Sequence, residues 1–545
     1  MTAGDEQGEG ARGRRRTGLC RCCRALIERL PILYLAAAAI AAFYLCEDEH
    51  VAVHIGWYRD NMPFLTYGDG NFGSEEFLKQ FRNFGGWIEF RARFLTYFFL
   101  TLDHYLRFFL YQYVRIPKGL SILYVPELVS VFLFYKLIRN ITGHKISSLL
   151  GTAFYVTSIG FTSGLSLMFM PGKPMTNVIF IIIAYLCSEM WRRDRDRLFI
   201  EQPIGLQIAV LATMFIGFNF DEGDFFAPVI APLLFPSLFW RRGRLPGNTA
   251  RNCRNILVYI LPVPCFLFFV LVVVPHITRT FYGYDFDFIS TVLGTHDPRM
   301  HEADYGLVGR FTLATLYSNF LAQVGTVVVP WWLDSGLAVG ARGVVKELWL
   351  AMLVAGAVVL PMLTRYAGAR LAYRSLLLLG LNILFSALLN GRHGVVVDGY
   401  YYGSAIAVFT SLSLTLACHA ACLHRPNVRR SAIVLAALPI FVQIGNAVKF
   451  ERDNQRLYDG LVLEFYAKSP SDIRPLFAAL DPHRGVSTEE LDWIWCLWKE
   501  GKWDELRTAD ISPGAVYLVA ELRRMDQLKG GRLPSGLLGA ETIAR

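Results

Sequence analysis

The chain has 545 residues, of which 54% are hydrophobic and 18% are charged, and its formal net charge is +9 at pH 7. Its mean hydropathy of +0.36 leaves too little polar surface for a soluble protein of this length. The basic residues lie in short clusters beside apolar segments, as the positive-inside rule predicts, which excludes a nucleic-acid-binding role for the charge. The composition predicts an all-α polytopic membrane protein.

The chain begins with an Arg-rich polar segment, residues 1–29, which we predict to be a disordered cytoplasmic tail. The apolar run 31–46 has no small-residue cleavage pattern after it, so we expect a retained first helix that crosses the membrane outward. Cys20, Cys22 and Cys23 precede this helix. S-acylation is chemically feasible there, but reduced thiols are the simpler expectation. The ten cysteines of the chain form no disulfide framework.

The remaining apolar runs belong to a predicted transmembrane domain over residues 30–448. Clusters such as "WRRDRDR" and "RRGRLPGNTARNCR" are expected on the inner side. With the N-terminus inside, about eleven helices then satisfy the charge rule and place the C-terminus outside. The later spans are expected near residues 120–138, 146–166, 175–191, 203–219, 224–240, 256–275, 348–363, 375–389, 402–422 and 431–447.

Two apolar segments are predicted not to span. In residues 93–114 apolar side chains follow helical spacing, while Thr96, Asp103 and Arg107 share the other face, which is typical of a helix at the membrane interface. A span there would turn "RRDRDR" outward, against the charge bias. Residues 310–333 are predicted to be interfacial or re-entrant, because another span would reverse every later orientation.

Two outward regions are large. The first outer loop, residues 47–119, contains a second predicted amphipathic helix around residues 77–88. Residues 449–545 have the composition of a small soluble helical domain, in which Ser487 and Glu490 form a capping box. Nothing in this domain has catalytic spacing.

The predicted topology gathers polar side chains on the outer side. Asp69 lies in the first loop, Asp221, Glu222 and Asp224 occupy the short turn "FNFDEGDFF", and Lys173 precedes a span. Carboxylates near cations suit a reaction in which an acceptor loses a proton and a phosphate departs. Other roles remain open, because Asp69 could cap a helix and the acidic turn could be a solvated loop.

A late outer loop, "GRHGVVVDGYYY", contributes Arg392, His393 and Asp398. The same two basic residues could instead anchor a helix end at the lipid headgroups, which is a common use of arginine.

The chain combines a long first outer loop, the "R-x-R-F" segment in "FRARF", the acidic "FDEGD" turn and the late Arg-containing loop. In these features it resembles the GT-C superfamily of polyprenyl-phosphate-sugar-dependent glycosyltransferases. The resemblance covers roughly the first 450 residues and is mainly architectural. It implies that Asp69 is the general base, with Asp221 and Glu222 as supporting acids. Asp69 lies farther from the first helix than the usual acid of the family, so Asp48, Glu49 and Asp60 remain alternatives.

The resemblance also implies that Arg93, Arg392 and His393 hold the lipid phosphate, and Lys173 lies on the same face. Some members of the superfamily bind a divalent metal such as magnesium or manganese. If one binds here, Asp69 and Asp221 are the expected ligands.

The expected function is therefore inverting sugar transfer from a polyprenyl-phosphate-linked donor at the outer face, to a glycan, lipid or protein acceptor. The membrane expected is a bacterial cytoplasmic membrane. The main alternative is a transporter or flippase for a lipid-linked or anionic solute. Spans nearly free of charge argue against it, with Glu127 and Glu189 as the main exceptions. A scaffold that displays the C-terminal domain, where a partner could bind, would not need eleven spans.

Overall fold

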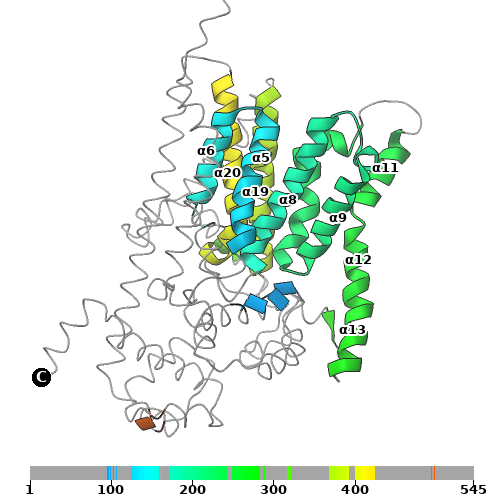
Figure 1. Ribbon diagram of the computed structural model, residues 1–545, viewed down its shortest axis with the longest axis vertical. Coiled ribbons are helices and arrows are strands. Elements are labelled where there is room, and N and C mark those ends of the chain that lie inside the picture. Colours follow the sequence, from blue (N-terminus) through cyan, green and yellow to red (C-terminus); the bar gives the residue numbers. More distant parts are fainter. Residues whose placement is uncertain are drawn as a thin grey trace, which may run out of the picture.

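The computed structural model describes part of the chain and contains helices and no strand within that part (Figure 1). The described residues are 95–96, 98–99, 102–103, 106, 124–158, 161, 172–241, 248–282, 286–288, 313–314, 316–320, 367–391, 399–423, 493, 496–497 and 502. The α-helical prediction is confirmed over these residues. The predicted first helix, the spans at 348–363 and 431–447, and all of the predicted C-terminal domain except residues 493, 496–497 and 502 lie outside them.

The first group of helices packs into one bundle, drawn from cyan to yellow in Figure 1. Helices α5 and α8 pack closely against each other, as do α19 and α20, and α20 also contacts α6 and α8. The bounds of the five helices are α5 Tyr124–Thr142, α6 Lys145–Val156, α8 Gly172–Arg193, α19 Ala367–Gly391 and α20 Gly399–Leu423.

The second group continues from α8 along the chain. Helix α9 packs on α8 and on α12, and α10 packs on α8 and α19. The bounds of these helices are α9 Ile204–Phe218, α10 Ala227–Leu234, α11 Asn248–Tyr259, α12 Pro262–Phe268 and α13 Val274–Ile277. Two π-helical turns, Phe269–Val273 and Thr278–Tyr282, make α12 and α13 parts of one long helical segment.

Within the described ranges, three helices are long and apolar enough to cross a membrane: Met175–Arg193, Pro262–Thr280 and Arg370–Leu389. Ile204–Phe218 and Ile406–Ala420 are shorter apolar helices. The span Pro262–Thr280 differs from the others because only 22% of its apolar window is buried, against 61% for Met175–Arg193. Leu267, Phe268 and Leu271 are among its exposed side chains. These helices support the prediction of an integral membrane protein.

Two predicted spans differ from the helices observed. The run 224–240 is not one helix. Helix α10 continues past Pro232 but ends at Leu234, just before Pro236, which begins a 3-10 turn. The span predicted at 256–275 crosses the junction of α11 and α12, and the apolar helix begins later, at Pro262. A run of apolar residues shows where the chain is hydrophobic, but it does not show where one helix ends and the next begins. This explains both differences.

The bundle core is aromatic where α8, α10, α19 and α20 meet. Phe226 lies between Phe385 and Phe409, with ring centroids 5.6 Å and 6.0 Å away, and Phe180 lies 5.4 Å from Phe409. Farther along the bundle, a Cβ atom on Gly151 would lie 2.6 Å from Oγ1 of Thr415. A glycine at this place lets α6 approach α20 closely, as small residues do between membrane helices.

Helix α9 connects two polar ends of the molecule. The turn end is the segment 219–226, which follows the last residue of α9. The arginine end contains residues 194–203, before the first residue of α9, together with Arg241 and the first turn of α11. Each end buries polar side chains, and the two do so in different ways.

Candidate functional site

The acidic turn is a capped 3-10 helix at the end of α9. Asp221 has extended backbone angles and its Oδ1 accepts a hydrogen bond from the Gly223 N–H at 2.9 Å, so it is the N-cap of the helix Glu222–Phe226. Before it, Nδ2 of Asn219 donates to the Phe215 carbonyl at 2.8 Å and closes the last turn of α9. Asp221 therefore has a structural role, whatever chemistry it performs.

All three carboxylates of this turn are buried in the protein. The exposed fraction is 1% for Asp221, 8% for Glu222 and 0% for Asp224. The alternative of a solvated acidic loop is therefore wrong for this turn. Burying three acids within four residues carries a large desolvation cost. No other buried segment among the described residues holds as many acids.

Contacts from two neighbouring helices hold Asp224. Oγ1 of Thr176, in the second turn of α8, donates to Oδ2 of Asp224 at 3.3 Å. Gly217 of α9 packs so closely that an added Cβ would lie 3.4 Å from the Asp224 side chain and 2.9 Å from Ile179. The turn is thus fixed between α8 and α9 by a hydroxyl group and by the absence of a side chain at residue 217.

The acidic turn also contacts the segment that contains residues 95–106, which is drawn in blue at the lower end of the bundle (Figure 1). The Leu95 N–H donates to the Asn219 carbonyl at 2.9 Å, and the Thr96 hydroxyl donates to the Phe220 carbonyl. The rings of Phe99 and Phe220 stack at a centroid distance of 5.4 Å. Two predicted outer loops therefore meet at this turn.

The described residues of that segment are helical, as predicted, but their polar face points into the protein. Thr96 and Asp103 are 2% and 1% exposed, whereas Phe98 is 37% exposed. Hydrophobic spacing predicted the helix and the shared face of Thr96 and Asp103. It could not predict that this face packs on the acidic turn.

The structure places only some of the predicted site residues. Asp221 and Glu222 lie in the acidic turn, and Lys173 is the second residue of α8. Asp69, Arg93, Arg392 and His393 lie outside the described residues, so their predicted convergence stays a prediction. Helix α19, which Arg392 follows directly in the sequence, packs against the acidic turn.

Sequence analysis noted Glu127 as an acid within a predicted span but did not select it as a site residue. It lies in the first turn of α5 and is 1% exposed. Its Oε2 is 3.5 Å from the Tyr155 hydroxyl, and that hydroxyl is 3.1 Å from Oγ of Ser130. The signal in the sequence was a single acid inside an apolar helix, "YVPELVSVFLF", which is a functional candidate in a membrane domain.

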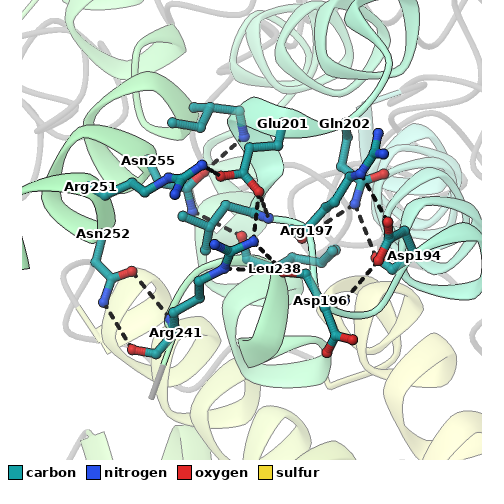
Figure 2. A network of polar contacts seen from close by, with 12 residues as sticks. Asp194, Asp196, Arg197, Glu201, Gln202, Leu238, Arg241, Arg251, Asn252 and Asn255 are labelled. Atoms are coloured by element: carbon teal, nitrogen blue, oxygen red, sulfur yellow. Dashed lines mark hydrogen bonds and ion pairs between the residues drawn. The ribbon is translucent and has the colours of Figure 1, made fainter. Parts of the chain in front are cut away.

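The arginine end contains a polar network that connects three loops and helices (Figure 2). Oε2 of Glu201 accepts from the Leu198 N–H and from Arg241, both at 3.0 Å, and its Oε1 pairs with Arg251. Arg241 also donates to the Asp196 carbonyl at 2.7 Å and 3.1 Å. Glu201 thus has two oppositely charged partners, and Arg241 connects it to a backbone carbonyl, so we assign this network a structural role.

Two asparagines complete the network of Figure 2. Asn255 is fully buried; it accepts from the Ile200 N–H at 2.9 Å and donates to the Leu238 and Phe239 carbonyls. Asn252 exchanges hydrogen bonds with the backbone of Arg241. Polar side chains of α11 thus satisfy backbone groups that the broken helices of this region leave open.

The part of the chain that the structure describes contains no group of three or more His, Cys, Asp or Glu side chains that could hold a metal ion. The acidic turn by itself is therefore not a metal centre. The predicted ligand pair includes Asp69, which lies outside the described residues.

The fold and the sites define an α-helical protein with helices able to span a membrane. Comparisons with protein-family models, with curated proteins and with solved structures give no match for this chain.

Proposed function

We propose that the chain is a membrane glycosyltransferase of the GT-C type, which moves a sugar from a polyprenyl phosphate to an acceptor at the outer face. The observation that carries this proposal is the acidic turn, in which Asp221, Glu222 and Asp224 are buried and held at one end of the bundle. The proposal includes about eleven spans, a cytoplasmic N-terminus and an outward C-terminal domain.

The contacts of the turn support a catalytic role. Carboxylates that act in catalysis must be held rigidly, and here the backbone of residues 219–220 is bonded to Leu95 and Thr96 of the first outer loop. That loop also supplies Asp69, the proposed base, while Arg93, Arg392, His393 and Lys173 are the proposed phosphate-binding residues. The acidic turn would orient the acceptor and these cations.

The reaction needs few protein groups. A polyprenyl phosphate is a good leaving group, so direct displacement at the anomeric carbon requires cations at the phosphate and a carboxylate that takes the acceptor proton. Displacement by the acceptor hydroxyl inverts the anomeric centre. The lipid chain stays in the membrane, which explains an active site beside apolar helices.

The test uses the full-length protein in lipid nanodiscs with a panel of synthetic polyprenyl-phosphate hexoses and pentoses. We expect release of lipid phosphate with at least one donor, and a loss of at least about 100-fold in D69N, because the general base is removed while its shape is kept. D221N should also lose activity, and it should remain folded because asparagine is an equally good N-cap.

The matched control is D196N, whose exposed side chain lies at the arginine end. It should retain wild-type turnover. Wild-type protein that releases no lipid phosphate from any donor would contradict the proposed function. A D69N variant with full activity would contradict the assignment of Asp69 as the general base.

A second candidate function is transport of a lipid-linked or anionic solute. Glu127 favours it, because a buried acid within a membrane helix is a common feature of transport pathways. Movement of a fluorescent polyprenyl phosphate across proteoliposomes, without sugar release, would select this function.

A further inference from the structure

The environment of Glu127 suits a neutral carboxylic acid better than a carboxylate ion. Its side chain is 1% exposed, and within the described part of the chain its Oε1 has no hydrogen-bond partner. Its Oε2 lies 3.5 Å from the Tyr155 hydroxyl. Among the described residues, the ion pairs do not include Glu127. A buried ion without a cation or strong donors is costly, and a carboxyl avoids that cost by binding a proton.

The neighbouring hydroxyl groups do not replace a cation. Ser130 Oγ donates to the Glu127 backbone carbonyl at 2.6 Å and is also a neighbour of the Glu127 carboxyl group, but a neutral hydroxyl stabilises a carboxylate ion less than a cation does. The aromatic rings of Phe134 and Phe161 lie 4.9 Å and 5.1 Å from the Tyr155 ring and complete an apolar wall. The polar groups facing Glu127 from α5 and α6 are thus neutral hydroxyls.

Glu127 lies at the same depth as the acidic turn. Asn140 of α5 donates to Ser188 and Glu189 of α8, so the last turns of these packed helices lie together. Counting back from this contact, Glu127 in α5 and Thr176 in α8 are separated from it by nearly the same number of residues. At 1.5 Å per residue, each helix rises by about 20 Å over that interval, so the two residues lie at a similar depth. Thr176 is the residue bonded to Asp224.

We propose that Glu127, with Tyr155 and Ser130, forms a proton-binding site in the membrane domain. The ligand is a single proton, which converts the Glu127 carboxylate into a carboxylic acid. The site belongs to the turn end of the bundle and is separate from Asp221, Glu222 and Asp224. It does not depend on the sugar-transfer proposal, because it concerns the protonation of one side chain.

The first experiment compares infrared spectra of the full-length protein and E127Q in lipid nanodiscs at pH 7. The wild-type-minus-variant spectrum should contain the C=O stretching band of one protonated carboxylic acid, and this band should shift in deuterated water. A difference spectrum that contains only carboxylate bands would overturn the proposal.

The matched control is E189Q. Glu189 lies at the other end of the bundle, where its carboxylate accepts from Asn140 at 2.8 Å and pairs with Arg192 at 3.1 Å. Its difference spectrum should contain the bands of a carboxylate ion. A protonated band from both residues would mean that the surroundings of Glu127 do not decide its state, which also overturns the proposal.

A second measurement needs no variant and remains informative if E127Q does not fold. Dicyclohexylcarbodiimide enters membranes and reacts with a carboxylic acid: the acid proton moves to nitrogen, an O-acylisourea forms, and it rearranges to a stable N-acylurea. Peptide mass spectrometry at pH 7 should find this adduct on Glu127 and not on Glu189. Absence of the adduct on Glu127, with labelling of other carboxyl groups, would contradict proton binding.

Discussion

Glu201 and Glu127 are two carboxylates at opposite ends of the helices, and their surroundings differ. Glu201 receives hydrogen bonds from a backbone N–H and from Arg241, and it pairs with Arg251. Glu127 is more deeply buried, and its described neighbours are neutral hydroxyl groups, with Tyr155 3.5 Å from its Oε2. The comparison teaches that burial alone does not reveal a function: a carboxylate paired with arginines holds loops together, whereas a buried one that is surrounded by neutral groups is a candidate for chemistry.

The largest effect is expected from Asn255 at the arginine end. In N255L the Ile200 N–H and the Leu238 and Phe239 carbonyls lose their partner inside the protein. We expect the free energy of unfolding to fall by about 3 kcal/mol, since each unsatisfied buried polar group costs about 1–3 kcal/mol. Denaturant unfolding in detergent micelles measures this change.

The control for Asn255 is T249L, at the exposed beginning of the same helix. It should change stability by less than about 0.5 kcal/mol, as surface substitutions usually do. Equal stability of N255L and the wild type would mean that the network of Figure 2 does not hold these loops.

A smaller loss is expected for E201Q, which keeps the shape of Glu201 and removes its charge. Arg241 and Arg251 are 34% and 50% exposed, so water compensates part of the lost attraction. We expect a loss of about 1 kcal/mol that decreases in high salt, because exposed ion pairs are screened. Thermal unfolding at two salt concentrations checks it, and a loss that does not respond to salt would contradict the electrostatic explanation.

The smallest effect is expected for E127Q. Glutamine has nearly the shape of a protonated glutamic acid, so the free energy of unfolding should change by less than about 0.5 kcal/mol. A strong loss of stability in E127Q would break the comparison, since Glu127 would then be a structural ion like Glu201. The same unfolding measurement as for N255L decides between these outcomes.

Sequence analysis predicted the elements that depend on local hydrophobicity. The runs at 175–191, 375–389 and 402–422 correspond to α8, α19 and α20, because long apolar segments form helices wherever they pack. It also selected Asp221 and Glu222 as unusual acids. Their burial confirms that the turn is not a solvated loop.

Other features depend on partners that are distant in the sequence. The burial of Thr96 depends on the Phe220 carbonyl, which lies 124 residues further along the chain, and the surroundings of Glu127 depend on Tyr155 of the next helix. A hydropathy pattern shows that a helix has a polar face, but it does not show which neighbour covers that face. The region of α10 differed for a local reason, since the helix ends just before Pro236, in the middle of an apolar run.

The exposed helical segment Pro262–Thr280 has a consequence for the membrane in which the protein works. Its 19 residues give a length of about 28 Å, close to the roughly 30 Å of a bilayer core. Most of its apolar window faces away from the protein, so a thinner or thicker bilayer would act on this segment first. Helix α8, with 61% of its window buried, is shielded from that mismatch by its neighbours. Lipid chain length should therefore alter the tilt of Pro262–Thr280 more than that of α8, which supports the acidic turn through Thr176.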